Sequence, residues 1–287
     1  MNHWKRYKYP IFLTIMAILT YLVLYDLIDG DWKSLENSLD NLSVFFHESL
    51  WPPNWKVLES NTVCERNWEV LCSPAYLGIS VTLKTAFVST CLGFMLSLPI
   101  AVLSSRNLNN DFIAIPFRYL LAAMRTLPSI LWALLFVITV GLGAVSGVLA
   151  LTFYTVGYLG KLQYEAIEGL DAEPLDAARA MGLKKAEIVQ RVVIPETGNS
   201  LISQLLFMFE YNVRHGSIIG IVGAGGLGYY IPTYLKFFQY DKIMALLIIL
   251  FVVVVIIDFL SMKARSYFVD DTTFKSPYLF GNIFKRK

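Results

Sequence analysis

The chain alternates between long apolar runs without charge and shorter polar stretches, a pattern typical of membrane-spanning helices. A helix needs about 20 apolar residues to cross a bilayer. The run 126–160 is too long for one span, and the glycines within 141–147 divide it into a helical hairpin. We therefore predict an all-α integral membrane protein with six transmembrane helices. Their approximate ranges are 10–28, 77–103, 112–140, 146–163, 197–216 and 241–262.

Composition supports this fold class. Of the 287 residues, 56% are hydrophobic and 16% are charged, and the mean hydropathy is +0.54. Soluble domains usually contain about 25% charged residues. The formal net charge of +2 says little about a partner, so the placement of the charges is the more informative property.

The positions of lysine and arginine predict the orientation in the membrane, because cytoplasmic loops carry an excess of both. With six spans, the basic residues of the N-terminal tail, the loop after the second span, the segment 161–191 and the C-terminal tail fall on one side. The segment 29–75 falls on the other side and is richer in acidic residues. We expect a multi-pass protein of the plasma membrane (in bacteria, the inner membrane) with both termini in the cytoplasm.

Three regions follow from this topology. Residues 1–74 comprise an anchor helix and an extracytoplasmic segment, 75–263 form the membrane core, and 264–287 form a cytoplasmic tail. The first apolar run has the basic flank of a signal peptide, but 27–30 (Leu-Ile-Asp-Gly) is not a small-residue cleavage site. We therefore expect an uncleaved anchor.

The extracytoplasmic segment has two features of its own. Leucines and a phenylalanine recur at helical spacing between Ser34 and Leu50, which predicts an amphipathic helix on the outer membrane surface. Cys64 and Cys72 also lie in this segment. They either form a disulfide in an oxidising compartment or remain two separate thiols, and the sequence leaves both states open.

A polar, helix-forming segment interrupts the membrane core between the fourth and fifth spans. A short helix is expected from about Pro174 to Gly182, which stops it, and a second from Leu183 to Val192, stopped by Pro195. Two short helices joined by a glycine present a rigid knob on one side of the membrane.

The knob carries a signature. In this signature, Glu-Ala-Ala is followed by three residues and a Gly, and then by nine residues and Ile, any residue, Leu-Pro. This chain has Asp176 in place of the Glu, Val192 in place of the Ile and Ile194 in place of the Leu. In this respect the chain resembles the permease subunits of ABC importers. The resemblance implies that the knob docks into a groove of a separate ATPase subunit. The docking residues that it implies are Asp176, Ala177, Ala178, Ala180, Gly182 and Pro195.

Further motifs narrow the resemblance. The segments 209–214 (Phe-Glu-Tyr-Asn-Val-Arg) and 218–228, which is rich in glycine, are similar to those of phosphonate-uptake permeases. So are 125–128 (Arg-Thr-Leu-Pro) and 103–107 (Leu-Ser-Ser-Arg-Asn). The likeness extends over about 75–263, which makes this region the expected permease core.

The resemblance implies a type I importer permease fold and a set of partners. Two permease copies, expected here as a homodimer, would form the pathway, together with two cytoplasmic ATPase subunits and an external solute-binding protein. ATP and Mg²⁺ would bind to the ATPase. We therefore expect that this chain is not itself an enzyme and binds no cofactor. The implied substrate is phosphonate, phosphite or phosphate.

Charges within the predicted spans are candidates for the translocation path, because an isolated charge in a bilayer is costly. Glu210 and Arg214 are four residues apart, which favours either an ion pair that pins helices together or a place on the path. Arg125 is a second cation within a span, and an electropositive path suits an anion. The predicted path or gate residues are Arg125, Glu210, Arg214, Gly223, Gly225 and Gly226.

The three glycines belong to a Gly-x-Gly-x-x-Gly sequence, 223–228, that also occurs in dinucleotide-binding proteins. Such a site requires a strand before the motif and a helix after it in a βαβ unit. Here the motif follows an apolar span, so we predict a helix break and a re-entrant turn within 217–235 instead.

Other function classes find little support. The sequence contains no Gly-x4-Gly-Lys-Ser/Thr, His-Glu-x-x-His or Gly-x-Ser-x-Gly motif, so neither ATP binding by a P-loop nor a common hydrolytic or metal site is indicated. The alternatives are a type I permease for methionine or a quaternary amine, an ion-driven secondary transporter, and a membrane anchor. A secondary transporter would need an unpaired acidic residue, and Glu210 has Arg214 beside it.

Overall fold

The computed structural model describes residues 3–27, 33–59 and 69–268 and divides into two compact units, residues 1–52 and 53–287. The first unit contains α1 (His3–Leu27), α2 (Lys33–Phe45) and a π-helical turn, Phe46–Leu50. The predicted helix over 34–50 is therefore α2 followed by this turn.

Among the described residues the second unit is helical and contains no strand. Its long helices are α3 (Pro74–Ser104), α4 (Asp111–Thr126), α5 (Ser129–Val140), α6 (Ala144–Glu168), α9 (Ile194–Ile219) and α11 (Tyr240–Phe268). Its short helices are α7 (Ala172–Ala180), α8 (Lys185–Ile188) and α10 (Tyr230–Lys236). By length and composition, five helical stretches of the described chain can cross a membrane, or six if the bent pair α4–α5 counts as one span, which agrees with the predicted number.

The core of the second unit is built on α3, α6 and α9, which pack against one another. Small residues line the contacts, as expected where packing rather than hydrophobicity holds spans together. A polar bridge adds to this: the amide nitrogen of Asn212 donates to the hydroxyls of Thr90 and Thr155, each at 2.9 Å. All three residues are buried, so this bridge fixes α9 against both neighbours.

The third span differs from the prediction, because 112–140 is not one straight helix. The chain bends by 85° between α4 and α5. Pro128 excludes the helical conformation for the residue before it, and Leu127 is accordingly extended with a ψ of 135°. The indole nitrogen of Trp132 donates to the carbonyl oxygen of Met124 at 3.0 Å and so satisfies a carbonyl that the break leaves without a helical partner.

The segment after α6 also differs in one respect. The second short helix does not stop at Pro195: α8 continues through a π-helical turn, Val189–Val193, directly into α9. Pro195, the second residue of α9, therefore lies within a continuous helical stretch and does not end it. The knob is therefore joined to the fifth span without a flexible link.

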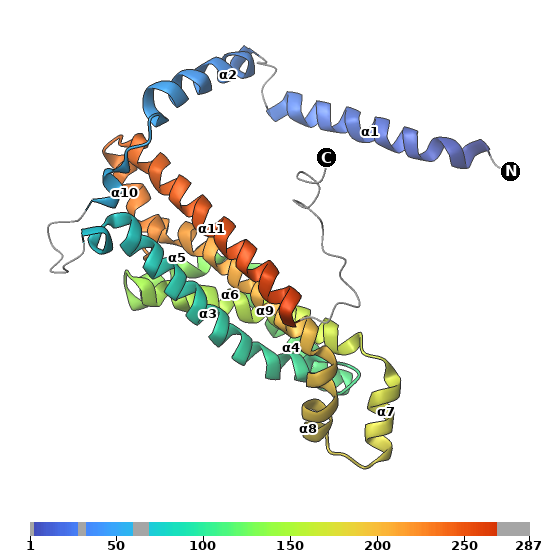
Figure 1. Ribbon diagram of the computed structural model, residues 1–287. Coiled ribbons are helices and arrows are strands. Elements are labelled where there is room, and N and C mark those ends of the chain that lie inside the picture. Colours follow the sequence, from blue (N-terminus) through green and yellow to red (C-terminus); the bar gives the residue numbers. More distant parts are fainter. Residues whose placement is uncertain (1–2, 28–32, 60–68, 269–287) are drawn as a thin grey trace, which may run out of the picture. The chain divides into compact units, whose positions relative to one another are not determined.

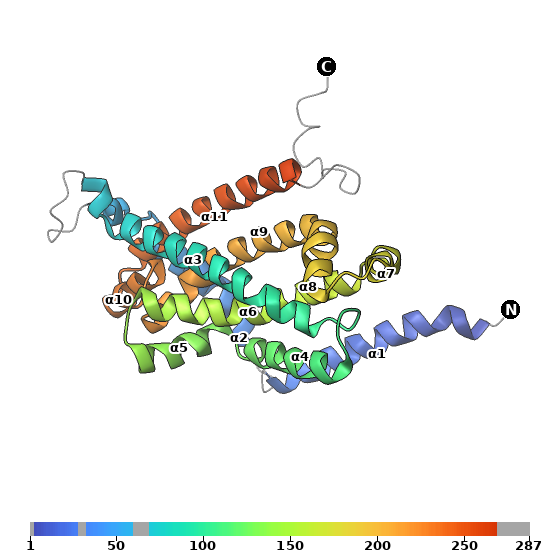
Figure 2. The same cartoon turned by 90° about the horizontal axis from the view of Figure 1, so that it is seen from below.

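In both views of the second unit, α7 and α8 lie at one end of the helical bundle and α10 lies at the other (Figure 1, Figure 2). The glycine-rich segment after α9 is folded as two short 3-10 turns, Gly220–Val222 and Leu227–Tyr229, before α10. The predicted helix break within 217–235 is thus present, although Pro232 lies inside α10.

Candidate functional site

The turn between α7 and α8 has the geometry that its sequence predicts. Gly182 has a φ of +75°, the left-handed conformation that glycine adopts at helix ends. Its N–H donates to the carbonyl of Arg179 at 3.0 Å, and the N–H of Leu183 donates to that of Ala178 at 3.2 Å. These two bonds form a Schellman motif, which closes α7 and fixes the direction of the chain into α8.

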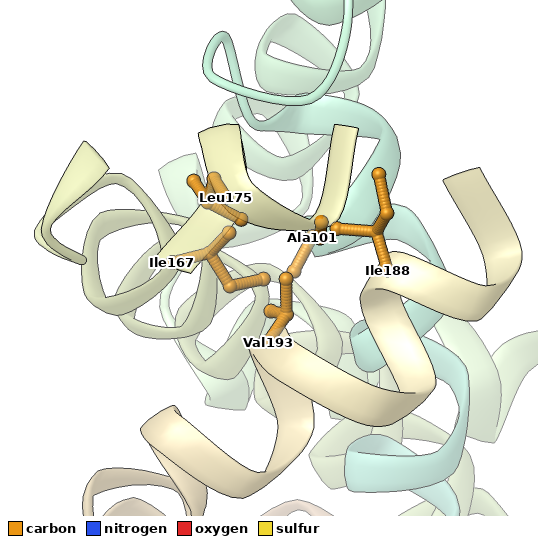
Figure 3. Packing of buried hydrophobic residues seen from close by; sticks show 6 residues of the cluster. Ala101, Ile167, Leu175, Ile188 and Val193 are labelled. Atoms are coloured by element: carbon orange, nitrogen blue, oxygen red, sulfur yellow. The ribbon is translucent and has the colours of Figure 1, made fainter. Parts of the chain in front are cut away.

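The knob is anchored by its own buried face. Leu175 and Ala178 of α7 pack with Ala101 of α3, Ile167 of α6 and Ile188 of α8. In the close-up these side chains converge with Val193 on one small core (Figure 3). Because the core joins the ends of α3 and α6 to the helix that runs into α9, the knob and these spans form one packed body.

The other face of α7 is open. Asp176, Ala177 and Ala180 are exposed, and Met181 at its end is 72% exposed. Of the predicted docking residues, Gly182 and Pro195 are exposed as well. Ala178 is not, since it is fully buried in the core below α7, so its place is structural.

Hydrogen bonds tie the knob to the loop between α3 and α4. Arg179 lies 2.9 Å from Asp176 and also donates to the carbonyl of Asn107. The amide nitrogen of Asn107 in turn donates to the carbonyl of Ile167 at 2.7 Å. The predicted carboxylate position of the signature, Asp176, is therefore held by an arginine that bridges to the neighbouring loop.

A second cation near this end of the bundle is paired as well. Arg118 binds Glu168 of α6, donates from Nε to the carbonyl of Ser104 at 2.8 Å, and lies 4.6 Å from the ring centroid of Tyr164. Arg118 therefore clamps α4 to the ends of α3 and α6.

The charges in the fifth span pair with the sixth. Nη2 of Arg265 lies 2.6 Å from Oε1 of Glu210, and Nη2 of Arg214 lies 2.7 and 2.8 Å from the two carboxylate oxygens of Asp258. The pair expected within α9, Arg214 with Glu210, is longer, at 4.0 Å. The charges of these two acidic and two basic side chains thus neutralise one another. The shorter ion pairs join α9 to α11 rather than lying within α9.

Arg125 is placed differently. It lies in the last turn of α4, beside the 85° break, and among the described residues no carboxylate forms an ion pair with it. Its backbone nitrogen would lie 2.9 Å from a Cβ built at Gly157, so the end of α4 packs closely on α6. Of the charged path candidates, this is the one whose charge is not neutralised.

Four half-buried side chains between α6 and α9 form what we call the aromatic cluster: Tyr154, Tyr158, Tyr211 and His215. The ring of Tyr211 is stacked on that of Tyr154 at 5.5 Å and on that of His215 at 3.7 Å. The hydroxyl of Tyr211 donates to that of Tyr154 at 2.9 Å. Our sequence interpretation missed this cluster. A signal was present, because Tyr154 and Tyr158, and likewise Tyr211 and His215, are four residues apart, a spacing that places two side chains on one helix face.

The predicted gate glycines lie in a tightly packed turn. Gly223, Gly225 and Gly226 all have positive φ angles, of 90°, 81° and 78°. The carbonyl of Gly223 accepts from the N–H of Gly143 at 2.9 Å, and the hydroxyl of Thr82 accepts from the N–H of Leu227 at 3.0 Å. The turn is therefore fastened to the start of α6 and to α3.

The remaining candidates concern cysteines and metals. Cys64 lies outside the described residues, so the Cys64–Cys72 bridge stays a prediction; Cys72 itself is buried. Within the described ranges, no group of three histidine, cysteine or acidic residues is arranged to hold a metal ion.

Comparison with known sequences gives a consistent picture. The family described as "Binding-protein-dependent transport system inner membrane component" matches residues 93–269. A putative phosphite transport system permease protein of Stutzerimonas stutzeri is 36% identical over 194 residues, which are 67% of this chain and 69% of that protein. A phosphate-import permease protein of Mycolicibacterium smegmatis is 32% identical over 204 residues, 71% of this chain and 38% of that longer protein.

Comparison with solved structures supports the fold. A chain of the MetNI methionine ABC transporter in an inward-facing conformation superposes with a TM-score of 0.58 at 24% identity. The superposition covers 66% of this chain and 93% of that one.

Proposed function

Because the chain belongs to the family of binding-protein-dependent transport system inner membrane components, we propose that it is the permease subunit of an ATP-driven importer for a phosphorus oxyanion. The relatives named for phosphite and phosphate transport support this substrate class. The motifs around Arg125 and Glu210, which resemble those of phosphonate permeases, extend it to phosphonates.

The knob supplies the link to ATP hydrolysis, and its anchorage is the observation that carries the proposal. Leu175 and Ala178 share one core with the ends of α3 and α6 and with the start of α9. An ATPase subunit that binds the exposed face of α7 would therefore move these spans together. Movement of the spans would open the path to one side of the membrane at a time.

The assembly follows from the number of knobs. One chain carries one docking surface, so two copies of the chain would engage two ATPase subunits, and an external binding protein would deliver the solute. ATP and Mg²⁺ would bind to the ATPase subunits. In this arrangement the knob and both termini face the cytoplasm.

The charges in the spans favour an anion importer over an ion-driven secondary transporter. The carboxylate of Glu210 is bound by Arg265 at 2.6 Å and is not free to carry a coupling ion. Arg125 has no carboxylate partner among the described residues and leaves a positive charge beside the break in the third span. We place Arg125 on the path and assign Glu210 and Arg214 to holding α9 against α11.

The test is ATP hydrolysis by the complex of this chain with its cognate ATPase in proteoliposomes. The binding protein is added empty or loaded with methylphosphonate, phosphite or phosphate, and methionine and choline serve as comparison solutes. We expect stimulation and uptake with at least one phosphorus oxyanion. Stimulation by methionine or choline alone would contradict the substrate class but keep the importer. Failure of any ATPase to bind the chain would contradict the proposal as a whole.

A further inference from the structure

The aromatic cluster has hydrogen-bonding capacity that the chain does not use. A tyrosine hydroxyl donates one hydrogen bond and accepts two. Tyr211 donates its proton to Tyr154, but among the described residues no acceptor is present for the proton of Tyr154 or for that of Tyr158. Two hydroxyl donors thus remain open on half-buried side chains of membrane-spanning helices. Polar groups at such depth face a partner or a path rather than lipid.

His215 adds an acceptor to these donors. Its Nδ1 lies 3.1 Å from the backbone carbonyl oxygen of Tyr211, and a carbonyl can only accept. The proton of the neutral ring is therefore on Nδ1, which leaves Nε2 as an acceptor. The imidazole is also stacked on the ring of Tyr211 at 3.7 Å, and this contact holds the ring within the cluster.

The last turn of α4, which carries Arg125, packs on α6 at the level of the aromatic cluster. Gly157 is on α6 between Tyr154 and Tyr158, and Arg125 packs against it through its backbone. The other cations close to this part of the chain are engaged: Arg214 with Asp258, and Lys161 with Glu165 at 3.4 Å. Among the described cations of α4, α6 and α9, Arg125 is thus the one that has no carboxylate partner and can bind a ligand of opposite charge.

Two open donors, one acceptor and one cation match a singly charged phosphorus oxyanion. Such an anion presents charged oxygens that accept hydrogen bonds and a P–OH group that donates one. We propose that the aromatic cluster, together with Arg125, is a binding site for this anion on the translocation path. The tyrosine hydroxyls donate to its oxygens, and Nε2 of His215 accepts from its P–OH. The site rests on the proposed function and adds a position within the membrane at which the solute is recognised.

The first experiment measures uptake of methylphosphonate by the reconstituted complex with binding protein. Tyr154→Phe and Tyr158→Phe keep the stacked rings and remove only the hydroxyls. We expect each to lower the uptake rate about tenfold, since a hydrogen bond to a charged group is lost. Tyr119→Phe is the matched control, because Tyr119 is also in a span but is 73% exposed on α4. Size-exclusion elution checks that all variants fold.

The second experiment measures binding to the permease–ATPase complex without binding protein. Methylphosphonate, at a pH at which it keeps one P–OH, is compared with methanesulfonate, an anion of similar shape that has no hydroxyl. We expect wild-type protein to bind methylphosphonate about tenfold more tightly, and His215→Ala to bind both alike. A merely structural role of His215 would leave this preference unchanged.

The outcomes separate the two proposals. Wild-type protein that imports methylphosphonate while the tyrosine variants import it at the same rate would overturn the site and keep the proposed function. Equal binding of the two anions by wild-type protein would overturn the role of His215. Wild-type protein that imports none of methylphosphonate, phosphite and phosphate would overturn the proposed function, and the site with it.

Discussion

The guanidinium of Arg265 binds the carboxylate of Glu210 at 2.6 Å, and this pair joins two helices through residues that are 55 positions apart in the chain. The side chain of Glu210 is only 10% exposed, whereas that of Arg265 is 35% exposed. The carboxylate therefore depends on the arginine much more than the arginine depends on the carboxylate.

Removing the arginine is expected to destabilise the protein more than neutralising the acid. Arg265→Ala leaves a buried carboxylate with only the more distant Arg214, at 4.0 Å, and is expected to cost at most about 3 kcal/mol, the lower end for a broken buried pair, because Arg265 is partly exposed. Glu210→Gln keeps a hydrogen-bonding group and removes the charge, so its cost is smaller. Thermal unfolding in detergent measures both.

The double variant provides the control for this prediction. If the two residues act through each other, Glu210→Gln combined with Arg265→Ala is more stable than the sum of the single changes predicts. Strict additivity would show that the pair contributes little and that Arg265 acts through other contacts.

Gly182 is expected to matter for coupling rather than for packing. A Cβ at this position would meet no atom within 4 Å, but its φ of +75° costs other residues about 1–2 kcal/mol. Gly182→Val is therefore expected to turn α7 relative to α8 while the spans stay folded. The measurement is ATP hydrolysis by the reconstituted complex, in which we expect stimulation by the loaded binding protein to be lost.

Gly198→Val is the matched control. Gly198 lies near the start of α9, also has no atom within 4 Å of a built Cβ, and has no positive φ. We expect this variant to behave as wild type. Normal stimulation in Gly182→Val would show that the turn does not transmit the motion of the ATPase.

Alanine variants at Gly226 and Gly141 distinguish the cost of backbone strain from the cost of a steric clash. Both adopt a conformation that is nearly restricted to glycine, with φ/ψ of 78°/−166° and 103°/172°. A Cβ at Gly226 would lie 2.6 Å from the hydroxyl oxygen of Thr82, whereas a Cβ at Gly141 would meet nothing within 4 Å. We expect Gly141→Ala to cost about 1–3 kcal/mol from strain. Gly226→Ala should cost about 1–3 kcal/mol more from overpacking.

Unfolding of the two alanine variants under identical conditions checks this difference. The hydroxyl of Thr82 also accepts from the N–H of Leu227 at 3.0 Å, so the displaced group is the one that holds the turn to α3. Equal destabilisation of the two variants would mean that the turn relaxes around the added methyl group.

Structural features that depend on residues adjacent in the sequence were predictable. The apolar runs predicted the spans, the glycines at 141–147 predicted the hairpin, and Gly182 predicted the end of α7. The break at Pro128 carried a local signal as well, because a proline excludes helix for the preceding residue, but the length of the apolar run favoured a continuous span.

Features that depend on which helix faces which were not predictable. The spacing of Glu210 and Arg214 suggested a pair within α9, yet their partners Arg265 and Asp258 come from α11. In the same way, Tyr154 and Tyr211 meet only because α6 and α9 are adjacent. Local periodicity places residues on a face of a helix, whereas only tertiary packing decides what that face contacts.

The angle between α4 and α5 also sets how far this span reaches. At 1.5 Å per residue the two helices are about 24 and 18 Å long, and at 85° the line between their far ends is about 31 Å. That length equals the hydrocarbon thickness of a typical bilayer, about 30 Å, whereas an unbroken helix over the same residues would be about 45 Å. If the bent pair α4–α5 is one span, its two far ends reach the two membrane surfaces only along this line. We expect thicker lipid to pull the angle open and thinner lipid to let it close, so that the lipid around the protein acts on the joint beside Arg125.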